Sequence, residues 1–282
     1  MAQQAELSSG RTCGGCTRCD STVLQRLGID TAGWDYLIAL AGNPNTGKST
    51  IFNALTGLRQ HVGNWPGKTV TRAEGAFRLS GRRYKVVDLP GTYSLLARST
   101  DEQVARDFLL FGRPDVAVVV VDASVLERNL NLALQVLEVT DRAVVALNLI
   151  DEAARKGIEV DSRSLARDLG MPVVPMAARR GVGVPELLSA IDEVAIGGYA
   201  VRPVRVRHGS EAVEQAVATL AAEVSELFPG LPNPRWVALR LLEGDETITA
   251  AVRDGSLGNG LAPGPAAARP VIPLTEAAHA DH

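Results

Sequence analysis

Residues 42–49 read Gly42-Asn43-Pro44-Asn45-Thr46-Gly47-Lys48-Ser49 and fit the pattern G-x-x-x-x-G-K-[ST] of a phosphate-binding loop. The apolar segment 36–41 before it predicts a buried strand, and segment 50–55 after it predicts the start of a helix. In that setting, backbone N–H groups and the helix dipole capture phosphate. We therefore predict that Lys48 contacts the β- and γ-phosphates of a nucleotide and that Ser49 holds Mg²⁺.

A second motif ends the predicted strand at 84–88, where Asp88-Leu89-Pro90-Gly91 gives D-x-x-G. The carboxyl end of a strand is where nucleotide sites form in open α/β sheets. Asp88 can hold Mg²⁺ through a water molecule there. Gly91 can donate its backbone N–H to the γ-phosphate and let the following loop move after hydrolysis.

A base-recognition motif follows the predicted strand at 142–147, as Asn148-Leu149-Ile150-Asp151. Asp151 can accept hydrogen bonds from the ring N1–H and the exocyclic amine of guanine, a pair of donors that adenine lacks. Asn148 can tie the base loop to the phosphate loop. After the last predicted strand, 173–175, the backbone N–H of Ala178 is expected to face the guanine O6.

Residues 61–70 contain two glycines, a proline and an asparagine, which predict a loop. A loop at this place in a phosphate-loop enzyme can close over the nucleotide. Thr69 is then the residue that offers its hydroxyl to Mg²⁺ and its N–H to the γ-phosphate. The alternative is that Thr69 only opens the strand predicted from Val70 to Phe77.

These elements predict an α/β fold, with a mostly parallel six-stranded sheet flanked by helices and a small all-helical domain appended to it. A short helix is expected at 21–30, before the sheet begins. The Gly-, Pro- and Ala-rich C-terminus predicts a disordered tail. The expected parts are an N-terminal cysteine-containing extension, an α/β domain, a helical domain and the tail, at 1–33, 34–198, 199–254 and 255–282.

The chain has 282 residues, of which 46% are apolar and 22% charged, as in ordinary soluble globular proteins. Its net charge of −3 gives no reason to expect a nucleic-acid partner. No apolar run approaches the ~20 residues needed to span a bilayer. The N-terminus lacks a basic region followed by an apolar core, so we expect a cytoplasmic protein.

All three cysteines lie in one short segment, Cys13-Gly14-Gly15-Cys16-Thr17-Arg18-Cys19. The spacing C-x-x-C-x-x-C lets the thiolates converge on one soft metal ion or cluster, with iron and zinc as the candidates. A ferredoxin-type run would place a fourth cysteine at position 23, which is Val23. The alternative, a flexible tail with free thiols, stays open.

The order of these motifs resembles that of a Ras-type small GTPase. More closely, the strings at 42–49, 62–67 (Val-Gly-Asn-Trp-Pro-Gly), 88–95 (Asp-Leu-Pro-Gly-Thr-Tyr-Ser-Leu) and 148–151 resemble the cytosolic G domain of the bacterial ferrous iron transport protein B family. Residues 235–245 resemble that family's helical domain, which damps nucleotide release. The resemblance covers about residues 35–250.

The resemblance implies a GTP- and GDP-binding regulatory domain of ferrous iron transport that hydrolyses GTP slowly. Asn45 matches the asparagine that helps this family coordinate K⁺ beside the phosphates, and Thr69 matches its switch threonine. Thr92 stands where Ras-like proteins carry a water-orienting glutamine. The implied partner is a membrane iron permease, in the same polypeptide or a separate one, which would place the domain at the inner face of the cell membrane.

The expected catalytic residues are Asn45, Lys48, Thr69 and Gly91, and the expected metal ligands are Ser49, Thr69 and Asp88 for Mg²⁺ and Asn45 for K⁺. The base loop departs from the family pattern, because Ala177 replaces the usual serine and removes a hydroxyl. The residues expected to contact the nucleotide are Gly42, Asn43, Pro44, Asn45, Thr46, Gly47, Lys48, Ser49, Thr50, Asn148, Asp151, Ala177, Ala178 and Arg179.

Two other functions remain open at this point. One is a soluble K⁺-dependent GTPase of the RNA-modification or ribosome-assembly kind, which shares this phosphate loop but for which a basic patch is missing. The other is a non-enzymatic, nucleotide-gated module whose N-terminal cysteines sense or deliver iron.

Overall fold

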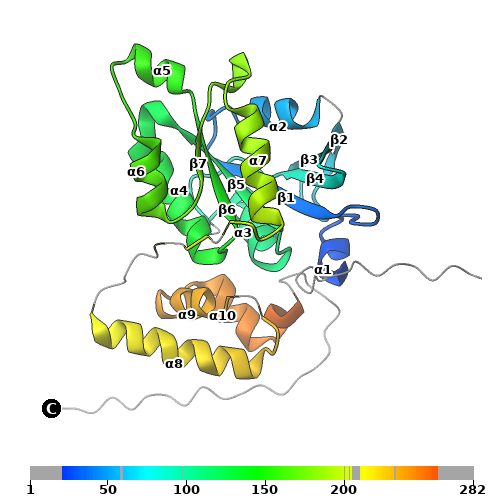
Figure 1. The fold of residues 1–282 in the computed structure, drawn as a ribbon. Coiled ribbons are helices and arrows are strands. Elements are labelled where there is room, and N and C mark those ends of the chain that lie inside the picture. Colours follow the sequence, from blue (N-terminus) through cyan, green and yellow to red (C-terminus); the bar gives the residue numbers. More distant parts are fainter. Residues whose placement is uncertain are drawn as a thin grey trace, which may run out of the picture.

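A computed structural model of the chain describes residues 21–57, 60–96, 98–199, 201–202, 204, 210–231 and 233–259. The sheet that it shows has seven strands in the order β2-β3-β4-β1-β5-β6-β7 (Figure 1). β1, β4, β5, β6 and β7 are parallel, whereas β3 is antiparallel to both β2 and β4. The strands are β1 (Tyr36–Gly42), β2 (Gln60–Asn64), β3 (Thr71–Leu79), β4 (Arg82–Asp88), β5 (Val116–Asp122), β6 (Ala143–Asn148) and β7 (Val173–Pro175).

Helices cover both faces of the sheet, and three more lie beyond one end of it (Figure 1). The α-helices are α1 (Ser21–Arg26), α2 (Lys48–Thr56), α3 (Thr100–Phe111), α4 (Leu126–Val139), α5 (Ile150–Arg155), α6 (Ser162–Leu169), α7 (Val184–Ala195), α8 (Glu211–Leu227), α9 (Pro234–Leu242) and α10 (Glu246–Arg253). Short 3₁₀ turns are η1 (Ala123–Val125), η2 (Ala178–Arg180) and η3 (Ser256–Asn259).

The central strands are apolar on both faces because each face is covered by helices. Ile38 and Leu40 of β1 join one buried cluster, which α2 and α7 complete. Ala39 and Ala41 point the other way, into a second cluster with α3 and α4. Side chains of a strand alternate between its faces, so one strand serves two cores.

The expected α/β class is confirmed, but the predicted strand number was wrong, because the sheet has seven strands and not six. The missed strand is β2, which lies where a loop was predicted and pairs with β3 from Gln60–Gly75 to Asn64–Thr71. β2 is an edge strand and is mostly exposed. It therefore lacks the apolar alternation that reveals a strand in a sequence.

Other elements also differ from the sequence-based expectations. α1 ends at Arg26, short of the predicted Asp30, because Gly28 turns the chain with φ +73°. The helices α3, α5, α6 and α10 were not predicted. The predicted disordered tail starts too early, since η3 forms at Ser256–Asn259 and Leu257 is fully buried.

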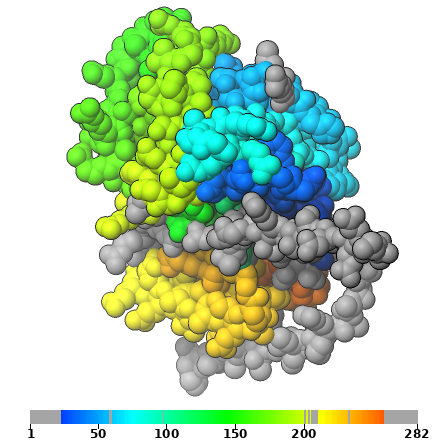
Figure 2. Space-filling view, turned by 45° about the vertical axis from the view of Figure 1, so that its right-hand side comes forward, coloured from blue at the N-terminus to red at the C-terminus, as the bar shows by residue number. Residues whose placement is uncertain are grey.

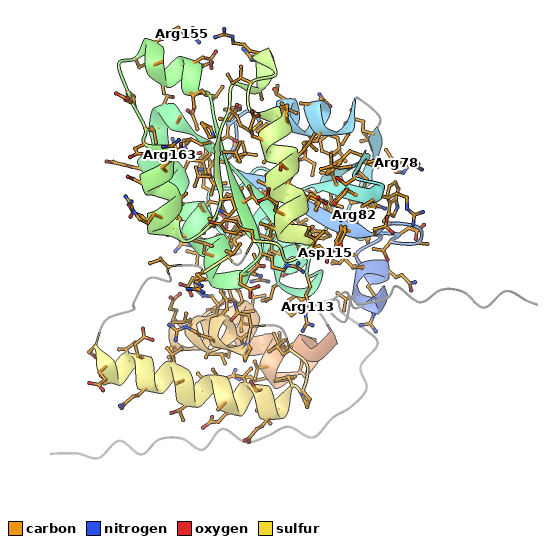
Figure 3. The ribbon with its side chains drawn as sticks, in the orientation of Figure 1. Arg78, Arg82, Arg113, Asp115, Arg155 and Arg163 are labelled. Atoms are coloured by element: carbon orange, nitrogen blue, oxygen red, sulfur yellow. The ribbon has the colours of Figure 1, made fainter. Side chains whose placement is uncertain are left out.

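The helices α8, α9 and α10 pack beside the lower end of the sheet domain, as Figures 1 and 2 show. Trp236 and Val237 of α9 belong to the same buried cluster as α3 and α4. The Asn233 side chain donates to the Val139 carbonyl at 3.2 Å, and Arg113, labelled in Figure 3, donates to the Gly230 carbonyl. None of the helices in the described part of the chain combines the length and apolar character needed to cross a bilayer.

Candidate functional site

The phosphate-binding loop connects the end of β1 to the start of α2. Gly47 adopts φ +83°, and a Cβ there would lie 2.4 Å from the side-chain nitrogen of Asn148, so no larger residue fits. Asn45 also has a left-handed backbone, with φ +66°, and its side chain is exposed. Asn43 is 2% exposed, and neither polar atom of its carboxamide has a hydrogen-bond partner among the described residues. A cradle with unsatisfied polar atoms suits a polar ligand.

Lys48 and Asp88 face each other at the centre of this site. The Lys48 ammonium donates a hydrogen bond to the Asp88 carboxylate, and the two side chains are only 11% and 17% exposed. Burial raises the pKa of Asp88, and the nearby charge of Lys48 opposes that rise. A bound nucleotide with Mg²⁺ would separate this pair. The ammonium would then contact a phosphate, and the carboxylate would face the metal ion.

Thr69 lies at the edge of a pocket of about 590 Å³, whose lining also includes Pro90 and Gly91. A Cβ on Gly91 would be 3.5 Å from Pro44, so the D-x-x-G turn lies against the phosphate loop. The opposite wall of this pocket is the start of α3, at residues 99–101, which sequence reasoning missed. The signal was present, because Ser99 and Glu102 have the S-x-x-E spacing of a capping box. The Ser99 hydroxyl accepts from the backbone N–H of Glu102, and the Glu102 carboxylate accepts from the backbone N–H of Arg98.

Asn148 joins the phosphate loop to the base loop. It ends β6, is 1% exposed, and donates from its side chain to the Thr46 carbonyl at 2.9 Å. Its side-chain oxygen accepts from the N–H of Ala178 at 3.1 Å. The expectation that the Ala178 N–H faces the guanine O6 is therefore corrected, since this donor already has a partner in the chain.

Asp151 lies in the first turn of α5 and is partly exposed. Leu149, with φ +62°, turns the chain between β6 and this helix. Ala177 and Ala178 are buried and Arg179 is exposed, on the turn that η2 forms. This turn and the phosphate loop both contact Asn148, so the base and phosphate sides of the site are held at a fixed separation.

The proposed cysteine ligands Cys13, Cys16 and Cys19 lie outside the described residues. Within the described ranges, no group of three or more histidine, cysteine, aspartate or glutamate side chains is placed to hold a metal ion. Mg²⁺ beside nucleotides is usually bound by hydroxyl, carboxylate and phosphate oxygens rather than by a protein cage, and Ser49, Thr69 and Asp88 carry oxygens of that kind.

Comparison with known proteins gives two family matches. Residues 36–191 match the family described as ferrous iron transport protein B, and residues 210–263 match the FeoB cytosolic helical domain. The Fe(2+) transporters FeoB of Salmonella typhi and of Escherichia coli K12 are each 44% identical over 212 residues, which is 74% of this chain and 27% of the relative. The chain therefore spans about a quarter of the length of the curated relatives it matches.

Solved structures give the same result. The cytosolic domain of L. pneumophila FeoB matches with a TM-score of 0.70 and 35% identity, over 80% of this chain and 87% of that one. The cytosolic domain of T. maritima FeoB in a GDP form matches with a TM-score of 0.70 and 38% identity, over 79% and 85%. A G domain of FeoB from Methanococcus jannaschii is 48% identical over 57% of this chain and 97% of its own, with a TM-score of 0.51.

Proposed function

This chain belongs to the ferrous iron transport protein B family, and we propose that it is a GTP-binding and GTP-hydrolysing regulatory domain of ferrous iron transport. The observation that carries the proposal is the Asn148 bridge, which fixes the phosphate loop against the base loop. A GDP-bound relative with the same fold supports it. The family matches favour this function over an RNA-modification GTPase.

Each residue then has a role in the bound state. Lys48 leaves Asp88 for the β- and γ-phosphates, and Ser49 and Thr69 offer hydroxyls to Mg²⁺. Asp88 would hold the same ion through a water molecule. Bound Mg²⁺ would neutralise the negative charge of the phosphates. Asp151 accepts hydrogen bonds from the N–H groups of the guanine edge. The backbone N–H of Arg179, the residue after Ala178, donates to the guanine O6.

The catalytic part of the proposal involves K⁺ beside Asn45. The side chain of Asn45 is exposed on the phosphate loop, where an oxygen ligand could help hold a monovalent cation against the phosphates. That charge would act as an arginine finger does in other GTPases. We expect GTP hydrolysis to be at least about tenfold faster in K⁺ than in Na⁺. Phosphate release measured in the two salts at equal ionic strength checks this.

Two variants of Asn45 separate its side chain from its backbone. Asn45→Ala removes the carboxamide but strains a left-handed position, whereas Asn45→Gly removes the carboxamide and accepts φ +66°. Both are expected to lose the K⁺ stimulation. If Asn45→Gly keeps the stimulation, the side chain is not a K⁺ ligand.

The N-terminal cysteines form the metal-binding part of the proposal, with Cys13, Cys16 and Cys19 as three thiolate ligands of iron or zinc. Co²⁺ added to the reduced chain should give thiolate-to-metal charge-transfer absorption. This absorption should disappear in the Cys13→Ser/Cys16→Ser/Cys19→Ser variant. A chain that binds no Co²⁺ above the level of the triple variant would show that the tail carries free thiols.

The partner and location follow from the family and stay part of the proposal. The curated relatives are named as Fe(2+) transporters. We propose that residues 34–198 form the G domain and residues 199–254 the helical domain. Together they would act on a membrane iron permease, within the same polypeptide or in a separate one, from the cytoplasmic side of the membrane.

A further inference from the structure

The segment before the sheet, Val23–Asp30, lies outside the residues that match the family and is nevertheless well packed on the sheet domain. In Figure 1, α1 lies at the lower edge of the sheet on the side of β3 and β4. In Figure 2 the dark blue surface of these first described residues adjoins the blue and cyan surface of the strands. Leu24 and Ile29 are 0% and 1% exposed, so the segment is anchored by two apolar side chains.

Two cationic side chains, both paired with one carboxylate, hold this segment by its backbone. Arg72 of β3 donates to the Leu27 carbonyl at 2.8 Å and pairs with Glu74 at 2.8 Å. Lys85 of β4 pairs with the other oxygen of Glu74 at 2.6 Å and donates to the Asp30 carbonyl at 2.6 Å.

The side chains of Arg72, Glu74 and Lys85 are 11%, 11% and 9% exposed. One buried carboxylate thus orients two cations, and each cation holds one end of a four-residue stretch of the chain.

The same arginine contacts the loop that carries Thr69. The Arg72 guanidinium carbon lies 5.5 Å from the centroid of the Trp65 ring. A Cβ placed on Gly28 would be 2.5 Å from Arg72 and 3.0 Å from the ring of Pro66, so the backbone of the segment also touches the loop directly. Gly28 has φ +73°, which permits this close approach.

Trp65 transmits this anchoring along the loop. It is 2% exposed, and its ring packs edge-on against Phe108 with the centroids 5.5 Å apart. The backbone N–H of Trp65 donates to the Val70 carbonyl at 2.9 Å, and the backbone carbonyl of Trp65 accepts from the Lys68 N–H at 3.0 Å. Thr69 lies between those two residues, so its backbone is fixed on both sides by bonds to Trp65.

We propose that Val23–Asp30 is a strap that holds the Trp65–Val70 loop and thereby positions Thr69 for hydrolysis. This rests on the proposed function, because it gives the N-terminal extension a role at the GTP site. Arg72 and Leu24 are positioning residues in this account, acting through Trp65. Loss of the strap leaves the phosphate and base loops intact, so it should slow the chemical step more than it weakens nucleotide binding.

The test uses the full chain with Arg72→Gln, which removes the Leu27 bond and the contact with Trp65 but leaves Glu74 paired with Lys85. Arg78→Gln is the matched control, because Arg78 lies on the same strand, is exposed, and points away at the outer edge in Figure 3. Leu24→Ser removes the apolar side chain that anchors the segment. Leu24→Met keeps an apolar side chain of similar size and should therefore keep the anchor.

Three quantities are measured: amide hydrogen exchange at Trp65 and Lys68, the single-turnover GTP hydrolysis rate, and the Kd for GDP. For Arg72→Gln and Leu24→Ser we expect exchange about tenfold faster, hydrolysis about tenfold slower, and a GDP Kd within about twofold of the wild type. Arg78→Gln and Leu24→Met should match the wild type in all three.

Two results would overturn the strap. Unchanged exchange in Arg72→Gln would show that the strap does not hold the loop. Faster exchange with an unchanged or faster hydrolysis rate would show that the held loop does not position Thr69.

A wild type that hydrolyses no GTP would instead contradict the proposed function, and the exchange measurement would still decide whether the strap holds the loop. A melting curve for each variant identifies any that fails to fold, and Arg72→Gln leaves the apolar anchor in place.

Discussion

Replacing Asp151 by asparagine is expected to weaken the binding of guanine nucleotides, GDP and GTP alike, by about 10³-fold. The carboxylate accepts two hydrogen bonds from the guanine edge, and each charge-assisted bond contributes ~1.5–3 kcal/mol. The carboxamide of asparagine offers one acceptor and one donor group, so one guanine N–H group faces an N–H and stays unpaired. Xanthine has a carbonyl in place of the exocyclic amine, so Asp151→Asn should bind xanthine nucleotides such as XDP better than guanine nucleotides such as GDP.

The measurement is the Kd of fluorescent GDP and XDP analogues for wild type and variant. Glu152→Gln is the matched control, because Glu152 is the next residue of α5 and its nearest cation is Arg155 at 3.8 Å. Its Kd for GDP should equal that of the wild type. An unchanged GDP Kd in Asp151→Asn would show that this residue does not read the base.

Replacing Lys48 by methionine is expected to lower the GTP hydrolysis rate by about 10²–10³-fold. The ammonium would stabilise the charge that develops between the β- and γ-phosphates, and methionine keeps the length of the stem without the charge. The change also leaves Asp88 without its partner in a site where its side chain is 17% exposed. The nucleotide-free variant should therefore melt at a lower temperature than the nucleotide-free wild type.

Single-turnover hydrolysis and a nucleotide-free melting curve check the two parts separately. Lys156→Met is the control, since the Lys156 ammonium contacts Ser124 at 3.0 Å in an exposed position beside α5. It should leave both quantities unchanged. A Lys48→Met variant that hydrolyses GTP at the wild-type rate would remove Lys48 from the mechanism.

Local patterns predicted the parts of the fold and site that depend on neighbouring residues. The strand, loop and helix around 42–49 were recognised because an apolar run, a glycine-containing loop motif and a helix-like segment follow one another directly in the sequence. The position of Asp88 at a strand end was predicted for the same reason, and β4 does end there. Once strands are parallel, their carboxyl ends meet at one edge, so the motifs converge.

Pairings between distant residues could not be predicted. β2 is missing from the prediction because its residues are exposed and its stability comes from pairing with β3. The bond from Ala178 to the Asn148 side chain joins residues thirty positions apart and changes which N–H remains for the base. Arg72 and Lys85 look like surface charges in a sequence, yet their acceptors are carbonyls 45 and 55 residues away.

The most direct test of the central claim is phosphate release by the purified wild-type chain given GTP or ATP, with Mg²⁺ and K⁺ present. The account predicts slow but measurable release from GTP and only background release from ATP, because Asp151 pairs with two donors that only guanine has. Equal release from both nucleotides, or none from either, would contradict it.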